Sequence, residues 1–341
     1  MQRRTLLRSM TAGPLAAALG AAAGCDKSVE GNDAGSGQSR ETIPYLTSYG
    51  NFGRDAYVYV AREKGYFAAA GFDVDIQPGQ GTGANIKQIL AGNALFTPVD
   101  LSGCLVAVGG KEKVAGVTAV AAIHQRTLTA IISLEGNKIG APRDLEGKTL
   151  ADLPGSVQRT LFPTYAKLAN FDYTKVKWIN ATPQTVMGTL ISGKAAGIGQ
   201  FVVGKPTLEA LAKGRKAVVL PFSDYLGDLY GNVLITSADY ARKNPEKVKR
   251  FTAALLRGLS DAIDNPTELG KILQKYVPTA NPGAAAAEMN LMAPYVRSAA
   301  AGLPVGALLA ERVARSIAIL QGSGQVEDGL TPEQVLNADP S

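Results

Sequence analysis

The chain has 341 residues, of which 46% are hydrophobic, and its formal net charge is +6. Arg3, Arg4 and Arg8 precede the first acidic residue, and without these three arginines the charge of +6 falls by three, to +3. No later run of clustered lysine or arginine is interleaved with aromatic residues, which argues against a nucleic-acid partner. The only histidine is His124, which excludes a metal site built on several histidines.

Residues 1–24 have the features of an export signal peptide. The basic start is followed by an uncharged stretch from Ser9 to Ala23, which is too short to cross a bilayer as a helix and is interrupted by Pro14. The end of this segment, Ala-Ala-Gly-Cys, resembles a bacterial lipoprotein signal, so Cys25 is the expected site of lipidation. The Arg-Arg-Thr-Leu-Leu start resembles a twin-arginine signal, with an ordinary basic segment as the alternative.

Residues 25–40 are predicted to be the lipidated cysteine and a flexible tether, because positions 26–40 are rich in glycine, serine and charged residues. The chain has two cysteines, and a lipidated Cys25 leaves Cys104 without an intramolecular partner. The neighbours of Cys104 are apolar, which predicts a small buried residue rather than a reactive thiol.

From residue 41 onward, short apolar runs alternate with helical patterns. The first set predicts strands at 42–46, 72–76, 95–99, 117–122 and 129–133, with helices at 55–64 and 84–91. The second set predicts strands at 149–151, 176–179, 196–199 and 217–220, with helices at 158–169 and 183–192. A strand at 233–236 precedes helices at 245–265, 267–275, 284–292 and 307–321. This alternation predicts two α/β lobes with parallel, doubly wound sheets and a cleft between them.

Residues 57–74, YVYVAREKGYFAAAGFDV, carry a specific pattern. They resemble the A-x-E-x-G-Y-F-x-x-x-G-L-x-V segment of periplasmic substrate-binding proteins in the sulfonate, nitrate and thiamine-pyrimidine group of ABC importers. Residues 144–148 (DLEGK), 230–234 (YGNVL) and 244–251 (NPEKVKRF) extend the resemblance, which covers about 42–335. One departure concerns the V-D-A that often follows L-x-S-G in the family. Here Lys194-Ala195-Ala196 follows instead, so an acid common near the cleft is missing.

The resemblance implies an α/β periplasmic-binding-protein type II fold, in which two α/β lobes joined by a hinge close on a ligand in the interlobe cleft. Lobe one would comprise residues 41–133 plus 236–341, and lobe two residues 134–235, with crossings near Ile132 and Leu234. The resemblance further implies a monomeric, lipid-anchored protein on the extracytoplasmic face of the cell membrane. Its expected partners are a small ligand and the permease and ATPase subunits of an importer.

Candidate ligand-binding residues lie in loops that follow the predicted strands, because open α/β sheets bind ligands at the carboxyl ends of their strands. Aromatic walls with a few polar groups are typical of such pockets. The first lobe supplies Tyr49, Asn51, Arg54, Gly81, Thr82, Ser102 and Gln125. The second lobe supplies Ser156, Gln158, Arg159, Gln200 and Phe201, and the stretch before the second crossing adds Asp224, Tyr225 and Tyr230.

The loop Gly79-Gln80-Gly81-Thr82-Gly83-Ala84 matches G-x-G-x-x-A, with Asp100 about 20 residues further on, and so a nucleotide-dependent enzyme is a remote alternative. The loop follows the second predicted strand and precedes a short helix, which favours amides that approach a polar ligand group. No Gly-x-Ser-x-Gly elbow occurs. The chain also lacks the cysteine-rich segment of enzymatic relatives that make the thiamine pyrimidine. No enzymatic activity and no cofactor are therefore expected.

Two ligand classes would need different contacts. A planar nitrogen heterocycle such as the thiamine pyrimidine would stack on tyrosines and donate to a carboxylate such as Asp224 or Asp228. Sulfonate, taurine or nitrate anions would favour Arg54, Arg126 or Arg159 and the amides of the glycine-rich loop. The run DYLGDLYGN at 224–232 favours the heterocycle.

Overall fold

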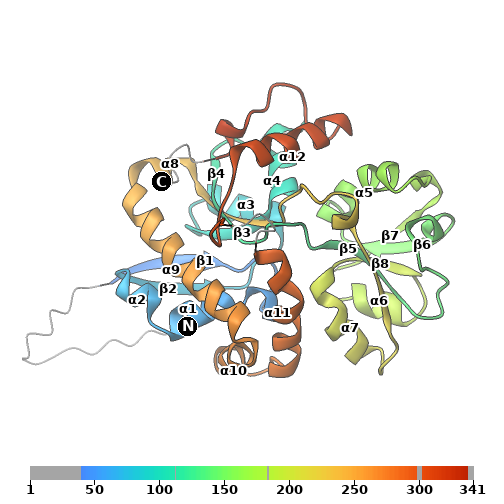
Figure 1. Ribbon diagram of the computed structural model, residues 1–341, viewed down its shortest axis with the longest axis horizontal. Coiled ribbons are helices and arrows are strands. Elements are labelled where there is room, and N and C mark those ends of the chain that lie inside the picture. The colour runs from blue at the N-terminus through green and yellow to red at the C-terminus, as the bar shows by residue number, and fades with distance from the viewer. Residues whose placement is uncertain (1–39, 112, 183, 298–301, 337–341) are drawn as a thin grey trace, which may run out of the picture. The chain divides into compact units, whose positions relative to one another are not determined.

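A computed structural model describes residues 40–111, 113–182, 184–297 and 302–336 (Figure 1). The expected signal peptide, the lipidation site Cys25 and the tether up to residue 39 lie outside the described residues. Within the described ranges, no helix is long and apolar enough to cross a membrane.

Among the described residues, the first lobe contains five strands. β1 (Glu41–Leu46) pairs in parallel with β2 (Phe72–Gln77), and β10 (Asn232–Ser237) lies between β3 (Thr97–Asp100) and β4 (Val117–Ala122). A bridge between Tyr45 and Phe96 joins β1 to the segment that enters β3, so the strands follow the order β2-β1-β3-β10-β4. β10 runs antiparallel to both of its neighbours.

The second lobe repeats this order. Its sheet contains β7 (Lys177–Asn180), β6 (Thr149–Asp152), β8 (Gly197–Phe201), β5 (Thr129–Leu134) and β9 (Ala217–Pro221), in the order β7-β6-β8-β5-β9. β5 is antiparallel to β8 and β9, while β6 is parallel to β7 and β8. The prediction of two α/β lobes is confirmed, but the prediction of purely parallel sheets is wrong. In each lobe, one strand is antiparallel to both of its neighbours. This strand is the one that follows a crossing from the other lobe: β10 in the first lobe and β5 in the second.

The chain crosses between the lobes through residues 123–128 and 222–231, because β4 and β10 lie in the first-lobe sheet and β5 and β9 in the second. The predicted crossings near Ile132 and Leu234 are wrong, since Ile132 is paired within β5 and Leu234 within β10. The expected boundaries at 133/134 and 235/236 therefore move to these two crossing segments. The sequence pattern identified the strands but could not assign β5 and β10 to a lobe.

Helices cover both sheets. Around the second-lobe sheet lie α5 (Val157–Leu168), α6 (Val186–Ile191) and α7 (Lys205–Leu211) (Figure 1). The first lobe carries α1 (Tyr57–Glu63), α2 (Tyr66–Ala69), α3 (Thr82–Leu90), α4 (Leu101–Gly109), α8 (Ala238–Lys243), α9 (Pro245–Asp264), α10 (Pro266–Tyr276), α11 (Pro282–Val296) and α12 (Ala310–Gly322). Sequence patterns missed α2, α4, α7 and α8. The first, third and fourth of these are very short, and α4 is almost wholly apolar, which hides a 3.6-residue period.

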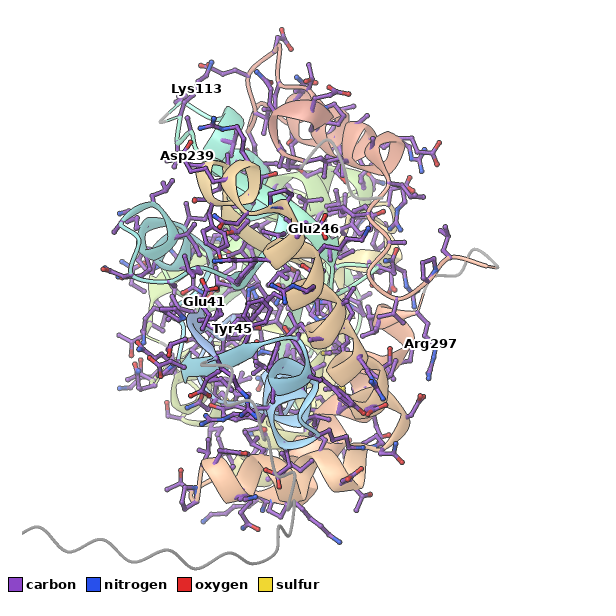
Figure 2. All side chains as sticks on the ribbon, turned by 90° about the vertical axis from the view of Figure 1, so that its left-hand side faces the viewer. Glu41, Tyr45, Lys113, Asp239, Glu246 and Arg297 are labelled. Carbon is purple, nitrogen blue, oxygen red and sulfur yellow. The ribbon has the colours of Figure 1, made fainter. Side chains whose placement is uncertain are left out.

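The core of the first lobe centres on α9. Its Phe251 stacks on Phe96 with ring centroids 4.0 Å apart and lies 6.2 Å from the ring of Tyr45 on β1. Figure 2 labels Glu41 and Tyr45 on β1 and Glu246 near the start of α9. An ion pair between Lys247 and Glu41, with a separation of 2.8 Å, ties the beginning of α9 to the beginning of β1. These contacts hold β1 and the segment that enters β3 against α9.

Candidate functional site

A pocket of about 320 Å³ is lined by residues from both lobes. The first-lobe lining consists of Ser48, Tyr49, Gln80, Gly81, Thr82, Gly83, Ala84, Val99, Asp100 and Asn232. The second-lobe lining consists of Asp152, Leu153, Pro154, Gly155, Ser156, Val157, Gln158, Val186, Gly199, Gln200 and Phe201. Most of these residues lie at carboxyl ends of strands or in the turns that follow, as the topological argument from the sequence requires.

Seven of the fifteen residues named as ligand contacts from the sequence line this pocket: Tyr49, Gly81, Thr82, Ser156, Gln158, Gln200 and Phe201. The other eight, Asn51, Arg54, Ser102, Gln125, Arg159, Asp224, Tyr225 and Tyr230, do not belong to its lining.

The glycine-rich loop forms the first-lobe side of the pocket. Gly79 allows a close approach, since a Cβ there would lie 1.9 Å from the carbonyl oxygen of Thr47. The side chain of Asn85 fastens the loop by accepting from the Gln80 amide at 2.9 Å and donating to the Thr47 carbonyl at 2.9 Å. Gly81 is the N-cap of α3 with φ +94°, and no side chain caps this helix. The first-turn amides of α3 therefore remain available at the pocket edge.

Asp100 brings a buried carboxylate to the same side. Its Oδ1 accepts from the amides of Ser102 at 2.9 Å and Gly103 at 3.2 Å, which makes Asp100 the N-cap of α4. Burial raises the pKa of Asp100 to about 6, against the opposing effect of these hydrogen bonds. The residue that the dinucleotide pattern would assign to a ribose is thus engaged as a helix cap.

Asp152 brings a second buried carboxylate, from the end of β6. Oδ1 accepts from the Leu153 amide at 2.7 Å, and Oδ2 accepts from the Ser156 hydroxyl at 2.5 Å. Burial raises the pKa of Asp152 to about 6, with the Ser156 hydrogen bond as the largest opposing effect. Each carboxylate has acceptor sites beyond the bonds it makes here. Asp100 comes from the first lobe and Asp152 from the second, so each lobe contributes one acid to the pocket lining.

Tyr49 and Phe201 give the pocket an aromatic residue from each lobe. Behind them lies the guanidinium of Arg54, at 5.6 Å from the ring centroid of Tyr49 and 5.3 Å from that of Phe201. Arg54 is 6% exposed and pairs with Asp55 at 3.5 Å. Burial raises the pKa of Tyr49 to about 12, so its ring is a neutral phenol at physiological pH.

Two arginines that were predicted to bind an anion, Arg54 and Arg159, make other contacts outside the pocket lining. Arg54 donates to the carbonyl of Tyr49 at 3.3 Å. Arg159 donates to the carbonyls of Asp152 at 2.9 Å and Ile179 at 2.8 Å, and its guanidinium lies 4.9 Å from the ring of Trp178. Both arginines support the residues that line the pocket. The third, Arg126, donates to the Pro294 carbonyl at 3.3 Å.

The predicted contacts near the crossings also have other partners. Tyr230 is buried, and its hydroxyl accepts from the Leu309 amide at 3.0 Å. Gln125 is buried and donates to the Ala307 carbonyl at 2.8 Å. Asp224 and Tyr225 are exposed, and the ring of Tyr225 packs edge-on against Tyr165 at 5.6 Å.

The remaining two predicted contacts, Asn51 and Ser102, lie outside the pocket lining. Asn51 accepts from the hydroxyl of Tyr59 at 3.0 Å, and Ser102 is buried in the first turn of α4. Asp100 and Asp152, which end β3 and β6, line the pocket but were not among the ligand contacts predicted from the sequence.

His124 and Cys104 show no catalytic arrangement. His124 is buried, its Nδ1 accepts from the Asn232 amide at 3.1 Å, and burial lowers its pKa to about 3. Cys104 is buried as expected, and burial raises its pKa to about 12. In the part of the chain that the structure describes, no cluster of three or more His, Cys, Asp or Glu side chains is placed to hold a metal ion.

Comparison with known proteins assigns the chain to a family. The NMT1/THI5-like family model matches residues 54–269, which is more than half of the chain. The chain belongs to the NMT1/THI5-like family. This confirms the resemblance inferred from residues 57–74.

The names of similar proteins describe different roles. The chain is 28% identical over 251 residues to the formylaminopyrimidine-binding protein of Halalkalibacterium halodurans, covering 72% of this chain and 74% of that one. It is 26% identical to the riboflavin-binding protein RibY of Chloroflexus aurantiacus, covering 66% and 63%. It is 22% identical to the 4-amino-5-hydroxymethyl-2-methylpyrimidine phosphate synthase of Schizosaccharomyces pombe, covering 68% and 69%.

Solved structures agree on the fold. The periplasmic aliphatic sulphonate binding protein SsuA of Escherichia coli superposes with a TM-score of 0.68 at 14% identity, covering 87% of this chain and 98% of that one. The NMT1/THI5-like chain therefore has the periplasmic-binding-protein fold, and its pocket lies where the two lobes of that fold meet.

Proposed function

We propose that this chain is an extracytoplasmic solute-binding lipoprotein of an ABC importer, anchored through lipid on Cys25, that captures a planar nitrogen heterocycle of the thiamine-pyrimidine type. Two relatives support the binding role and the ligand class, since formylaminopyrimidine and riboflavin are both nitrogen heterocycles. The ligand bridges the lobes, and the closed form is delivered to the permease.

The composition of the pocket lining carries this proposal. Among the described residues, those that line the pocket include two aspartates, Asp100 and Asp152, and no lysine, arginine or histidine. A sulfonate or nitrate would meet two buried carboxylates without a cationic side chain to compensate them. An aminopyrimidine carries N–H donors that match carboxylate acceptors.

The aromatic residues suit the same ligand. Tyr49 comes from the first lobe and Phe201 from the second, so a flat ring between the lobes contacts one or both. Aromatic contact adds roughly 0.5–1.5 kcal/mol to the free energy of area burial. Polar contacts then fix the orientation of the ring within its plane.

An anion-binding function is the second candidate, and one observation favours it. The first turn of α3, starting at Thr82, points uncapped amides at the pocket, and helix N-termini stabilise negative charge. The N-termini of α4 and α5 are different, because Asp100 and Ser156 cap them. The N-terminus of α6, whose first residue Val186 also lines the pocket, has no side-chain cap either. Because the same pocket buries two carboxylates and its lining, among the described residues, includes no cationic side chain, we favour the heterocycle.

An enzymatic role analogous to that of the synthase relatives has no support in the site. The histidine is packed against the Asn232 amide and the Met292 sulfur, at 3.1 and 3.2 Å, rather than facing the pocket. We therefore propose binding without chemical conversion.

A thermal-shift screen with product analysis tests the function. The panel contains 4-amino-5-hydroxymethyl-2-methylpyrimidine, formylaminopyrimidine, riboflavin, ethanesulfonate, taurine and nitrate. We expect a saturable rise in melting temperature with a pyrimidine and recovery of that compound unchanged by mass spectrometry. A rise in melting temperature with only the anions would contradict the heterocycle as the ligand class. Chemical conversion of a pyrimidine would contradict binding without catalysis and indicate an enzyme.

A further inference from the structure

The two crossing segments, residues 123–128 and 222–231, lie side by side. The amide of Thr127 donates to the carbonyl of Leu229 at 2.9 Å, and the amide of Gly231 donates to that of His124 at 3.2 Å. The segments therefore form one hydrogen-bonded strap between the lobes. Any change in the angle between the lobes must bend this strap.

Arg312 of α12 contacts both segments of the strap. Its Nη1 donates to the side-chain Oε1 of Gln125 at 3.1 Å, and its Nη2 donates to the backbone carbonyl of the same residue. Nη2 also donates to the carbonyl of Asp228, in the other crossing segment, at 3.4 Å. A guanidinium holds its donors in a rigid planar fork spread over several nitrogens, whereas an ammonium donates from a single atom at the end of a flexible stem.

The surroundings hold Arg312 in this position. The guanidinium lies 4.0 Å from the ring centroid of Tyr230, and the hydroxyl of that tyrosine accepts from the Leu309 amide at the N-cap of α12. Both the strap and the start of the helix are therefore attached to the same group of side chains. None of Arg312, Gln125 and Tyr230 lines the ligand pocket.

We propose that Arg312 is a hinge-positioning residue, which ties both crossing segments to α12 of the first lobe and confines interlobe bending to residues 126–128 and 223–227. On the second-lobe side, Phe222 is fixed by stacking on Tyr165 of α5, with ring centroids 4.1 Å apart. Between Phe222 and the carbonyl of Asp228 lies Gly227, where a Cβ would meet only the Ser223 carbonyl at 3.4 Å. The first segment becomes part of the second-lobe sheet at Thr129.

Loss of this tie lengthens the bendable part of the strap. The ligand-free protein then samples a wider range of lobe separations, and more conformational entropy is lost when a ligand bridges the lobes. We expect the affinity for a bridging ligand to fall although no pocket contact has changed.

The decisive measurement needs no ligand. Spin labels at Lys167→Cys on α5 and Glu246→Cys on α9, in the full chain with Cys25→Ser, report the distance between the lobes by pulsed electron resonance. Both sites are exposed, and the buried thiol of Cys104 is protected from labelling. We expect Arg312→Gln to broaden the distance distribution relative to the unsubstituted arginine.

Arg315→Gln is the matched control. Arg315 lies one turn further along α12 and makes an exposed pair with the Asp228 carboxylate at 3.7 Å, without contact to Gln125. We expect its distribution to equal that of the parent protein. If Arg312→Gln does not fold, Arg312→Lys keeps the charge without the fork and should broaden the distribution to a smaller extent.

A second readout depends on the proposed function, with 4-amino-5-hydroxymethyl-2-methylpyrimidine as the probe. Its affinity should fall roughly 2- to 30-fold in Arg312→Gln and remain unchanged in Arg315→Gln. Failure of the probe to bind any variant contradicts the ligand class and leaves the distance result standing. A distance distribution identical to that of the parent in a folded Arg312 variant overturns the hinge proposal.

Discussion

The carboxylate of Asp152 lies against the backbone of Gly199, so closely that a Cβ on residue 199 would be 1.9 Å from Oδ2. Asp152 ends β6 and Gly199 lies in β8, which is the next strand in the sheet. The missing side chain at position 199 therefore lets a buried acid extend over β8 into the pocket lining.

Gly199→Ala should displace this carboxylate. We expect the overpacked site to lower the free energy of unfolding by about 1–3 kcal/mol. We also expect a pyrimidine ligand to bind roughly tenfold more weakly, because a hydrogen bond to a charged group is lost. Urea unfolding and calorimetry measure the two effects. The control is Gly188→Ala on α6, where an added Cβ meets nothing within 4 Å and should leave binding unchanged. Equal binding by Gly199→Ala and its parent would contradict a role of Asp152 in the pocket.

The aromatic walls predict a contrast between two aromatic residues in the pocket lining and one outside it. Phe201→Ala and Tyr49→Ala should each weaken pyrimidine binding by roughly 1–3 kcal/mol, through lost ring contact and burial. Tyr225→Ala should have no effect on binding, because that side chain is 43% exposed and lies outside the pocket lining. Isothermal calorimetry compares the three variants. A silent Phe201→Ala beside an impaired Tyr225→Ala would place the ligand elsewhere.

The two pocket acids predict a pH dependence of stability. Burial raises the pKa of both Asp100 and Asp152 to about 6, whereas an unfolded aspartate titrates near 4. The folded protein therefore binds protons more tightly in this window, so these groups lower the free energy of unfolding as the pH rises from about 4 to 6. The groups that face Asp152 are the Ser156 hydroxyl, the Leu153 amide and Arg159. Asp152→Asn should remove its share of this decline.

Urea unfolding at pH 4.5 and 7.5 measures the decline in Asp152→Asn and in its parent. Asp239→Asn is the control, because hydrogen bonds from Arg242 and Lys243 lower the pKa of this exposed carboxyl. Its contribution has the opposite sign, being present at neutral pH and lost as the pH falls. A pH dependence of Asp152→Asn equal to that of the parent would show that Asp152 titrates normally.

Much of the fold was predictable because its signals are local. The apolar period of α9 and the alternation around β2 depend on neighbours in sequence, and both elements lie within one or two residues of their predicted ends. Lobe membership of β5 and β10 was not predictable from periodicity. It depends on which strands pair at long range, as β5 does with β8 and β9 and β10 does with β3 and β4.

The site was predictable to the extent that strand topology determines it. Tyr49, Gln200 and Phe201 follow strands and line the pocket. Tyr230 also lies in a loop between strands, but its hydroxyl bonds to Leu309 and its ring packs on Arg312. Those partners come about 80 residues later in the sequence, and no local pattern around Tyr230 indicates them.

Membrane attachment is a separate prediction, because Cys25 lies outside the described residues. We expect Cys25→Ala to abolish lipid labelling and to release a folded protein into the soluble fraction, since a polar tether follows that position. Fractionation of cells with labelled fatty acid checks this. Continued integral membrane behaviour of the Cys25→Ala protein would contradict a lipid anchor as the attachment.

Calorimetric titration of the unsubstituted protein at low and high salt tests the central claim most directly. We predict that 4-amino-5-hydroxymethyl-2-methylpyrimidine binds saturably, with an affinity that changes little with salt, because stacking and buried hydrogen bonds are weakly screened. Ethanesulfonate and nitrate should give no binding heat in a pocket lined by Asp100 and Asp152. Salt-sensitive binding of either anion, with no heat from the pyrimidine, would contradict the heterocycle-binding function.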